Sequence, residues 1–154
     1  AETLRVLTQN SKLKTQNSED KIDRFLETGM RALQGGINQV KIGNRIGHIS
    51  KAIQEVVESE GYSVVRSLIG HGIGKDLHED PEVPGFLDKA LAKTPKLREG
   101  MTIAIEVIYN MGKSDVTYLN NDSWTIKTKD NSLSGLFERT VAITDEVPVV
   151  LTKK

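Results

Sequence analysis

The sequence has 154 residues, the length of a single domain, and a chain of this size buries most of its apolar surface when it folds. Lysine and arginine number 21, as do aspartate and glutamate, so no basic balance of charge favours nucleic-acid binding. No apolar run approaches the roughly 20 residues of a membrane span, and the lack of cysteine excludes thiol chemistry and thiolate zinc sites.

The first segment, Glu2 to Thr8, has the pattern of a short strand. It lacks the basic and apolar stretches of a secretory signal. The absence of cysteine fits a cytoplasmic protein. Because the sequence starts with Ala1 rather than Met, we expect that this is not a natural translation start. A polar linker that carries lysine is expected from Gln9 to Gln16.

Two amphipathic helices are predicted next. Asn17 or Ser18 can cap the first helix, and the glycine pair at 35–36 is expected to end it. Its apolar face consists of Ile22, Phe25, Leu26, Met30 and Leu33. After a connector at residues 37–44, the second helix ends at Gly61 and has an apolar face of Ile46, Ile49, Ile53, Val56 and Val57. His48 lies off this stripe, so we interpret it as a solvated surface residue without a role.

Two of the three histidines lie seven residues apart in the glycine-rich stretch from Ser67 to Pro81. The apolar run from Tyr62 to Ile69 predicts a strand with His71 at its end, where the flanking glycines let the backbone approach a ligand. His78 stands in a run whose proline predicts a turn. One histidine in such a place is typical of a core beside a tight turn, but two of them favour a metal ligand or catalytic base.

Glu106 is the one carboxylate in a strongly apolar predicted strand, Met101 to Asn110, which follows a loop at residues 84–100. Burying a carboxylate there is costly unless it is paired or bound to a metal. The alternative is that Glu106 faces solvent on an edge strand. The alternation of the strand argues against this alternative, because it places Glu106 on one face with Thr102, Ala104 and Ile108.

The rest of the sequence predicts further strands. A polar excursion, Met111 to Asp122, precedes strands expected at residues 124–129, 136–144 and 147–152. The first of these carries the only tryptophan, Trp124, and the second carries another carboxylate in an apolar setting, Glu138. A strand, two helices and an antiparallel series of strands predict an α+β fold, in one domain that spans residues 1–154.

His71, Glu106 and Glu138 are expected on three separate strands. One imidazole with carboxylates suits a divalent transition metal such as Mn, Fe, Co or Zn. A carboxylate that bridges two such ions gives an arrangement that activates water for hydrolysis. Ligands from distant strands form no local motif, so their spacing alone is a weak signal. A serine hydrolase is not supported, since the sequence lacks the Gly-x-Ser-x-Gly motif.

Six segments, in order along the chain, resemble type I methionine aminopeptidases. They are Val40–Gly47, Gly70–Gly74, Leu77–Pro81, Glu99–Glu106, Trp124–Asp130 and Phe137–Thr140. The resemblance runs from residue 1 to about residue 152. It implies the pita-bread fold, in which two similar α+β halves surround a dinuclear metal site, and this sequence resembles the C-terminal part. It also implies removal of the initiator methionine from nascent peptides.

The resemblance assigns roles to individual residues. His71, Glu106 and Glu138 match ligands of two divalent metal ions (Co, Mn, Fe or Zn), and Glu106 also matches the proton shuttle. His78 matches a catalytic histidine that hydrogen-bonds the substrate amide and the tetrahedral intermediate. Leu77 and Trp124 match walls of the pocket for the methionine side chain. The implied partners are peptides that begin with Met, without nucleic acid or membrane, and the full enzymes are cytoplasmic and usually monomeric.

The sequence also departs from the family pattern. The family has two aspartate ligands in its N-terminal half, and Ala1–Thr3 resembles the end of the strand that carries the second one. The isolated chain is therefore expected to bind metal weakly and to be inactive. Val107 replaces a usual proline, and Leu136 and Arg139 replace a usual glutamine and histidine beside Glu138.

Two other interpretations stay open. One is a non-catalytic pita-bread module that binds a partner, and the other is a proline-specific peptidase of the same fold. The joint presence of His71, His78, Glu106 and Glu138 favours an enzyme over a binding module. The segments around Trp124 and Glu138 resemble the methionine enzyme more than the proline-specific one.

Overall fold

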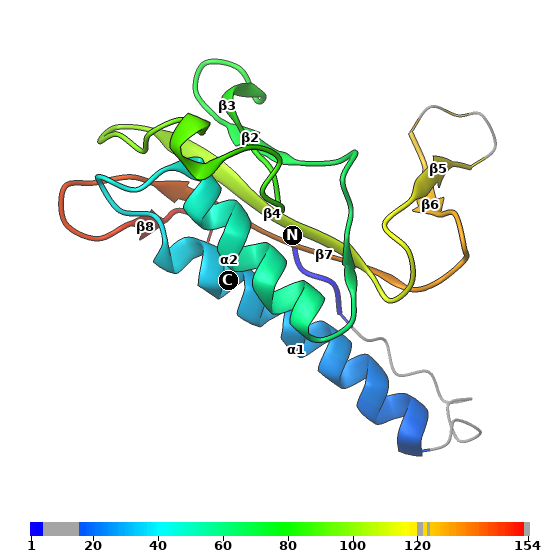
Figure 1. Cartoon of the computed structure of the whole chain (residues 1–154). Coiled ribbons are helices and arrows are strands. Elements are labelled where there is room, and N and C mark those ends of the chain that lie inside the picture. The colour runs from blue at the N-terminus through cyan, green and yellow to red at the C-terminus, as the bar shows by residue number, and fades with distance from the viewer. Residues whose placement is uncertain (5–15, 120–121, 123, 153–154) are drawn as a thin grey trace.

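In the computed structural model, residues 1–4, 16–119, 122 and 124–152 are described. In chain order they form α1 (Gln16–Asn38), α2 (Ile46–Ser59), β1 (Ser63–Val64), β2 (Gly70–Gly72), β3 (Glu79–Val83), the 3-10 helix η2 (Leu91–Lys93), β4 (Thr102–Asn110), β5 (Val116–Tyr118), β6 (Ile126–Thr128), β7 (Ser134–Ala142) and β8 (Val149–Val150). Both α-helices cover one face of the main sheet, and the β5–β6 hairpin projects from its end (Figure 1). The predicted α+β class is confirmed. None of the helices in these residues has the length and apolar character to cross a bilayer.

The long pair β4–β7 forms the centre of the sheet. These two strands are antiparallel and stay in register from Thr102 opposite Ala142 to Asn110 opposite Ser134. In the described residues the strand order is β3-β2-β4-β7-β8, and β1 also pairs with β4, beside Tyr109 and Asn110. Glu106 therefore lies on a central strand, and the alternative of an exposed edge strand is wrong.

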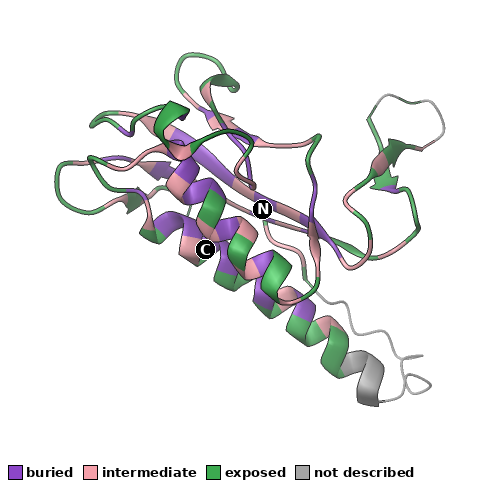
Figure 2. Ribbon diagram, in the orientation of Figure 1, coloured by how far each residue is buried: buried purple, intermediate pink, exposed green. Residues whose placement is uncertain are grey.

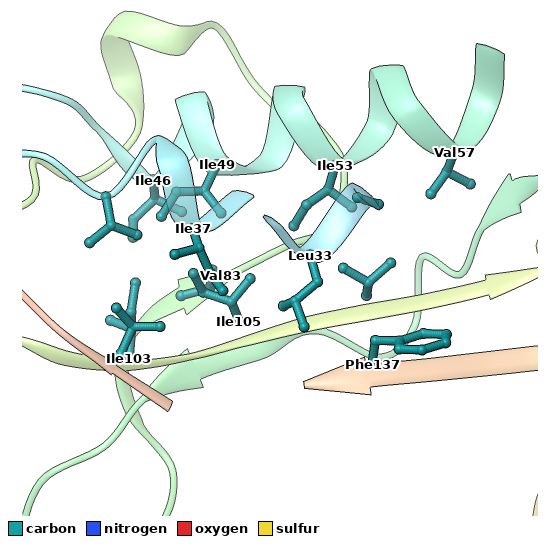
Figure 3. Close-up of a cluster of buried hydrophobic side chains, with 14 of the residues drawn as sticks. Leu33, Ile37, Ile46, Ile49, Ile53, Val57, Val83, Ile103, Ile105 and Phe137 are labelled. Carbon is teal, nitrogen blue, oxygen red and sulfur yellow. The ribbon is translucent and has the colours of Figure 1, made fainter. Parts of the chain in front are cut away.

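The hydrophobic core lies between the sheet and the two helices. Alternating residues of β4 face the helices and are 0% exposed: Ile103, Ile105, Val107 and Tyr109. Buried side chains from α1, α2 and β7 fill the space against them (Figure 3), among them Leu33, Ile37, Ile46, Ile49, Ile53, Val57 and Phe137. In Figure 2, the buried residues (purple) recur along both helices and along β4. The other residues of β4, including Glu106, face away from this core. The face that strand alternation predicted for Glu106 is thus confirmed.

The C-terminal end of α1 differs from the prediction. α1 continues through the glycine pair to Asn38, so the predicted stop is wrong. A Cβ on Gly36 would lie 3.1 Å from Cγ1 of Ile53 in α2, so this glycine permits close packing of the two helices. Met30, expected on the buried face, is 57% exposed. α2 agrees with the prediction, and Gly61 beyond its end has a φ of 80°.

Residues 1–3 lie alongside β7. Glu2 forms a single bridge with Phe137. Thr3 Oγ1 donates to the carbonyl of Leu136 at 3.0 Å and accepts the N–H of the same residue at 2.7 Å. Residues 5–8 of the predicted first strand and residues 9–15 of the predicted linker lie outside the described residues. Ala1 is consequently placed beside Glu138, whose amide donates to the Ala1 carbonyl at 2.8 Å.

Candidate active site

Glu106 and Glu138 are directly paired on the two central strands of the sheet. Side chains of directly paired residues point to the same face, which here is the face away from α1 and α2. Both side chains are partly buried, with exposed fractions of 17% for Glu106 and 31% for Glu138. Two carboxylates that lie far apart in the sequence are therefore neighbours in the fold.

His71 joins this face from the neighbouring strand. His71 on β2 is paired with Ala104 on β4, and Glu106 lies two residues further along β4 on the same face. The Nε2 atom of His71 lies 3.4 Å from Oε1 of Glu106. Nδ1 lies 2.8 Å from the carbonyl oxygen of Gly72, so the proton belongs on Nδ1. Nε2 is the ring nitrogen that faces Glu106, as in a histidine whose Nδ1–H is held by a backbone carbonyl and whose Nε2 is left to bind metal.

The surroundings of His71 differ from the prediction. Tyr62–Ile69 was expected to be one strand with His71 at its end, but only Ser63 and Val64 of that run are in a strand. His71 instead lies in the middle of the short strand β2. A Cβ on Gly70 would lie 3.1 Å from the carbonyl oxygen of Val83, and closer still to that of Ala104. The glycine before His71 therefore allows β2 to lie close to both of its neighbouring strands.

The surroundings of Glu106 disfavour the ionised form of its carboxyl group. Its burial raises the pKa of Glu106, and the charge of Glu138 raises it further, whereas His71 and the N-terminal ammonium act in the opposite direction. The Ala1 nitrogen lies 3.4 Å from Oε2 of Glu138. Two close carboxylates of this kind are stabilised by a nearby cation. This pair of carboxylates, together with the imidazole of His71, fits a divalent ion such as Mn, Fe, Co or Zn.

The described residues do not contain a complete set of metal ligands. Among those residues, no group of three or more His, Cys, Asp or Glu side chains is arranged to hold a metal. His71 contacts Glu106, whereas the carboxylate of Glu138 approaches the Ala1 ammonium. The assignment of His71, Glu106 and Glu138 as metal ligands stays a prediction.

His78 is exposed and lies beside His71, with 4.2 Å between the ring centroids and 53° between the ring planes. The residues after it do not form the predicted turn. Asp80 and Pro81 belong to β3, which pairs with β2 and forms one edge of the sheet. An edge strand tolerates proline because the missing N–H is not needed for pairing.

Leu77 and Trp124 are far more exposed than the walls of a closed pocket. Leu77 is 67% exposed and Trp124 is 87% exposed. Trp124 precedes β6 in the projecting hairpin (Figure 1), where its backbone N–H donates to Oδ1 of Asp122 at 2.9 Å. Their contact with a methionine side chain stays a prediction.

The three departures from the family pattern lie in different surroundings. Val107 is fully buried in the core, on the face opposite to Glu106. Leu136 is paired with Ile108 on the same face as Glu138. Arg139 forms an ion pair with Glu2 and donates to the carbonyl of Glu138 at 2.8 Å. Arg139 therefore helps to fix the N-terminal residues against β7.

Two residues with local roles were missed in the sequence. The interpretation of His48 as a solvated residue without a role is wrong: it is half-buried, and its Nδ1 accepts the N–H of Arg45 at 2.9 Å at the start of α2. Glu79 accepts the N–H of Asp76 at 2.8 Å. In both pairs the acceptor lies three residues after the donor, a spacing typical of capping interactions that could have indicated them.

A cavity of about 510 Å³ lies between α2, β3 and the loop at residues 84–101. Its lining includes Ile46, Ser50, Pro81 and Lys96, but neither His71 nor Glu106 nor Glu138. This hollow is therefore separate from the candidate residues.

Known proteins resemble this chain in sequence. The profile of metallopeptidase family M24 matches residues 12–149. A methionine aminopeptidase of Clostridium acetobutylicum is 50% identical over 117 residues, which are 76% of this chain and 46% of that protein. A methionine aminopeptidase of Borreliella burgdorferi is 39% identical over 140 residues, which are 91% of this chain and 55% of that protein. The chain thus spans about half the length of these relatives.

Solved structures agree with the sequence matches. The crystal structure of methionine aminopeptidase from Rickettsia prowazekii matches with a TM-score of 0.81 and 34% identity, covering 87% of this chain and 53% of that chain. A prolidase from Pyrococcus horikoshii, with a TM-score of 0.63 and 23% identity, shares the fold alone. The expected pita-bread fold and the resemblance to methionine aminopeptidases are confirmed. This chain belongs to metallopeptidase family M24.

Proposed function

We propose that this chain is the C-terminal part of a methionine aminopeptidase, an enzyme that removes the N-terminal methionine from peptides with the help of two divalent metal ions. One observation carries the proposal: Glu106 and Glu138 are directly paired on the open face of the sheet, and His71 lies 3.4 Å from Glu106 on the same face. The sequence identities of 39–50% to methionine aminopeptidases support the choice of substrate.

We propose a role for each candidate residue. His71, Glu106 and Glu138 would hold the ions (Co, Mn, Fe or Zn), which when bound polarise water and the peptide carbonyl. Glu106, partly buried beside the imidazole, would take a proton from water and pass it to the leaving amine. His78, exposed beside His71, would donate a hydrogen bond to the substrate's amide oxygen. Leu77 and Trp124 would contact the methionine side chain.

The proposed partners are peptides that begin with methionine. We assign the enzyme to the cytoplasm, where such peptides are made, and expect it to act as a monomer without nucleic acid or membrane. A non-catalytic binding module is less well supported, because such a module does not require the contact between His71 and Glu106. A proline-specific peptidase shares the fold, but its likeness to this chain, 23% identity for one prolidase, extends no further.

Methionine release from a short peptide tests the proposal. The N-terminal half of the Clostridium acetobutylicum relative is fused ahead of Ala1, and the fusion protein is assayed with Co, Mn or Fe. We expect turnover by the fusion protein and none by the 154-residue chain alone. Glu106→Gln and His71→Ala should abolish turnover. His78→Ala should lower kcat about 100-fold while metal content is retained, since it removes a donor to the oxyanion. Turnover of proline dipeptides instead would favour the prolidase alternative.

A further inference from the structure

The side chain of Glu79 folds back onto the loop that carries His78. Its Oε1 accepts the backbone N–H of Asp76 at 2.8 Å. Within the same loop, the N–H of Gly74 donates to the carbonyl of Asp76 at 3.2 Å. The N–H of Ile73 donates to the backbone carbonyl of Thr102 on β4 at 2.9 Å. These three hydrogen bonds fix the loop from its start at β2 to its end at β3.

Gly74 provides the space for this interaction. A Cβ built on Gly74 would lie 2.9 Å from both Cδ and Oε1 of Glu79, and closer still to Oε2. The backbone of Gly74 is not among the positive-φ glycines, so its conformation does not require glycine. The missing side chain at Gly74 therefore serves the close approach of the Glu79 carboxylate.

Glu79 also connects the loop to the candidate site through its backbone. It is paired with Gly72, the residue after His71. His78, the residue before Glu79, places its ring 4.2 Å from the ring of His71. Leu77 and His78 are both exposed, so packing does little to hold them in place. The hydrogen bond from Asp76 to Glu79 therefore restrains the backbone just before His78.

We propose that Glu79 is a positioning residue, which fixes His78 beside His71 by holding the turn at Gly74–Asp76. The inference rests on the proposed role of His78 as a donor to the substrate's amide oxygen. Such a donor must be held in place before the reaction, because a displacement of about 1 Å can cost up to 100-fold in rate. Glu79 itself touches neither substrate nor metal in this account.

The test compares variants of the metal-loaded fusion protein. Glu79→Ala should lower kcat about 10-fold while KM, metal content and the thermal unfolding temperature stay unchanged. Glu79→Gln should restore most of kcat, because its amide oxygen can accept the same N–H. Gly74→Ala, which displaces the carboxylate without removing it, should match Glu79→Ala. Glu82→Ala, at an exposed glutamate of the same strand, is the matched control and should behave as the parent.

Amide hydrogen exchange tests the hydrogen bond between Asp76 and Glu79 independently of its effect on catalysis. In the 154-residue chain, Glu79→Ala should speed exchange of the Asp76 amide about 10-fold, and Glu79→Gln should not. If Glu79→Ala keeps the parental kcat, or if Glu79→Gln loses as much as Glu79→Ala, the positioning role is wrong. A parent fusion protein without turnover would instead overturn the proposed function, and unchanged exchange at Asp76 would overturn the structural part of this inference.

Discussion

Glu106 and Glu138 face each other across the central strand pair, so two carboxylates share one small, partly buried area of the sheet. Burial raises the pKa of Glu106, and the charge of Glu138 adds to the effect. The ionised carboxyl is therefore less favourable in the folded chain than in the unfolded chain. A site built for a cation has this property, because the charges that bind the ion repel each other without it.

Glu106→Gln should accordingly stabilise the metal-free chain. A carboxyl whose pKa is raised on folding loses stability as the pH rises through its folded pKa. The gain in the variant should therefore appear at neutral pH and vanish below the usual value of 4.5. We expect an increase of about 2 °C in the unfolding temperature, measured in EDTA. Glu82→Gln on β3 is the control, and a lower unfolding temperature for Glu106→Gln would contradict this account.

Gly29 in α1 should not tolerate a side chain. A Cβ on this residue would lie 2.6 Å from Oη of Tyr109 and closer still to the ring of Phe137. We expect Gly29→Ala to lower the free energy of unfolding by about 2 kcal/mol through overpacking. Gly35→Ala in the same helix, where the nearest atoms lie 3.9 Å away, should raise it by about 0.5 kcal/mol through helix propensity. Urea unfolding measures both, and a stabilising Gly29→Ala would show that the helix does not pack this closely.

Regular patterns in the sequence predicted most of the fold. The period of α2, the alternation of β4 and the motifs around His71 and Glu138 led to elements and a family that the structure and the relatives confirm. The patterns failed where long-range packing decides. The glycine pair in α1 predicted a stop, but the approach of Ile53 makes Gly36 part of the helix interface. Pro81 predicted a turn, but it lies within the edge strand β3, whose residues Glu79 and Val83 pair with β2 on either side of it.

The candidate site was predictable only in part, for a similar reason. The sequence contained the residue types, and the resemblance assigned their roles, but only the register between β4 and β7 places Glu106 opposite Glu138. The role of Glu79 depends on a side chain that folds back over Gly74, which strand and helix periods do not describe. The exposure of Leu77 and Trp124 likewise depends on how their loops project from the sheet.

Asp130 should contribute stability that depends on pH. Hydrogen bonds from the backbone N–H of Lys113 and from Ser132 lower the pKa of Asp130 to about 2. A carboxyl with a lowered pKa stabilises the fold above its unfolded pKa, and this contribution is lost as the pH falls through the folded value. Asp130→Asn should therefore reduce stability at pH 7, and the difference from the parent should shrink between pH 3.8 and about 2. Urea unfolding across this range checks the trend, with the exposed Asp145→Asn as control.

The isolated chain should bind a hydrophobic dye. Met30 is 57% exposed and lines a hollow of about 240 Å³ together with Leu33, Ile37, Phe137 and Val150. Exposed apolar groups of this kind bind such dyes. We expect Met30→Lys to lower dye fluorescence, and Ile42→Lys, at an exposed residue outside this hollow, to lower it less. Equal fluorescence of Met30→Lys and the parent would show that the dye binds elsewhere.

The number of Co(II) ions bound per molecule tests most directly whether His71, Glu106 and Glu138 form one metal site. Equilibrium dialysis of the fusion protein should give about two ions for the parent. His71→Ala, Glu106→Gln and Glu138→Gln should each bind about one ion or fewer, because each removes a ligand of the site. Glu82→Gln should bind as many as the parent. The same stoichiometry and affinity in all four variants would contradict a metal site at these three residues.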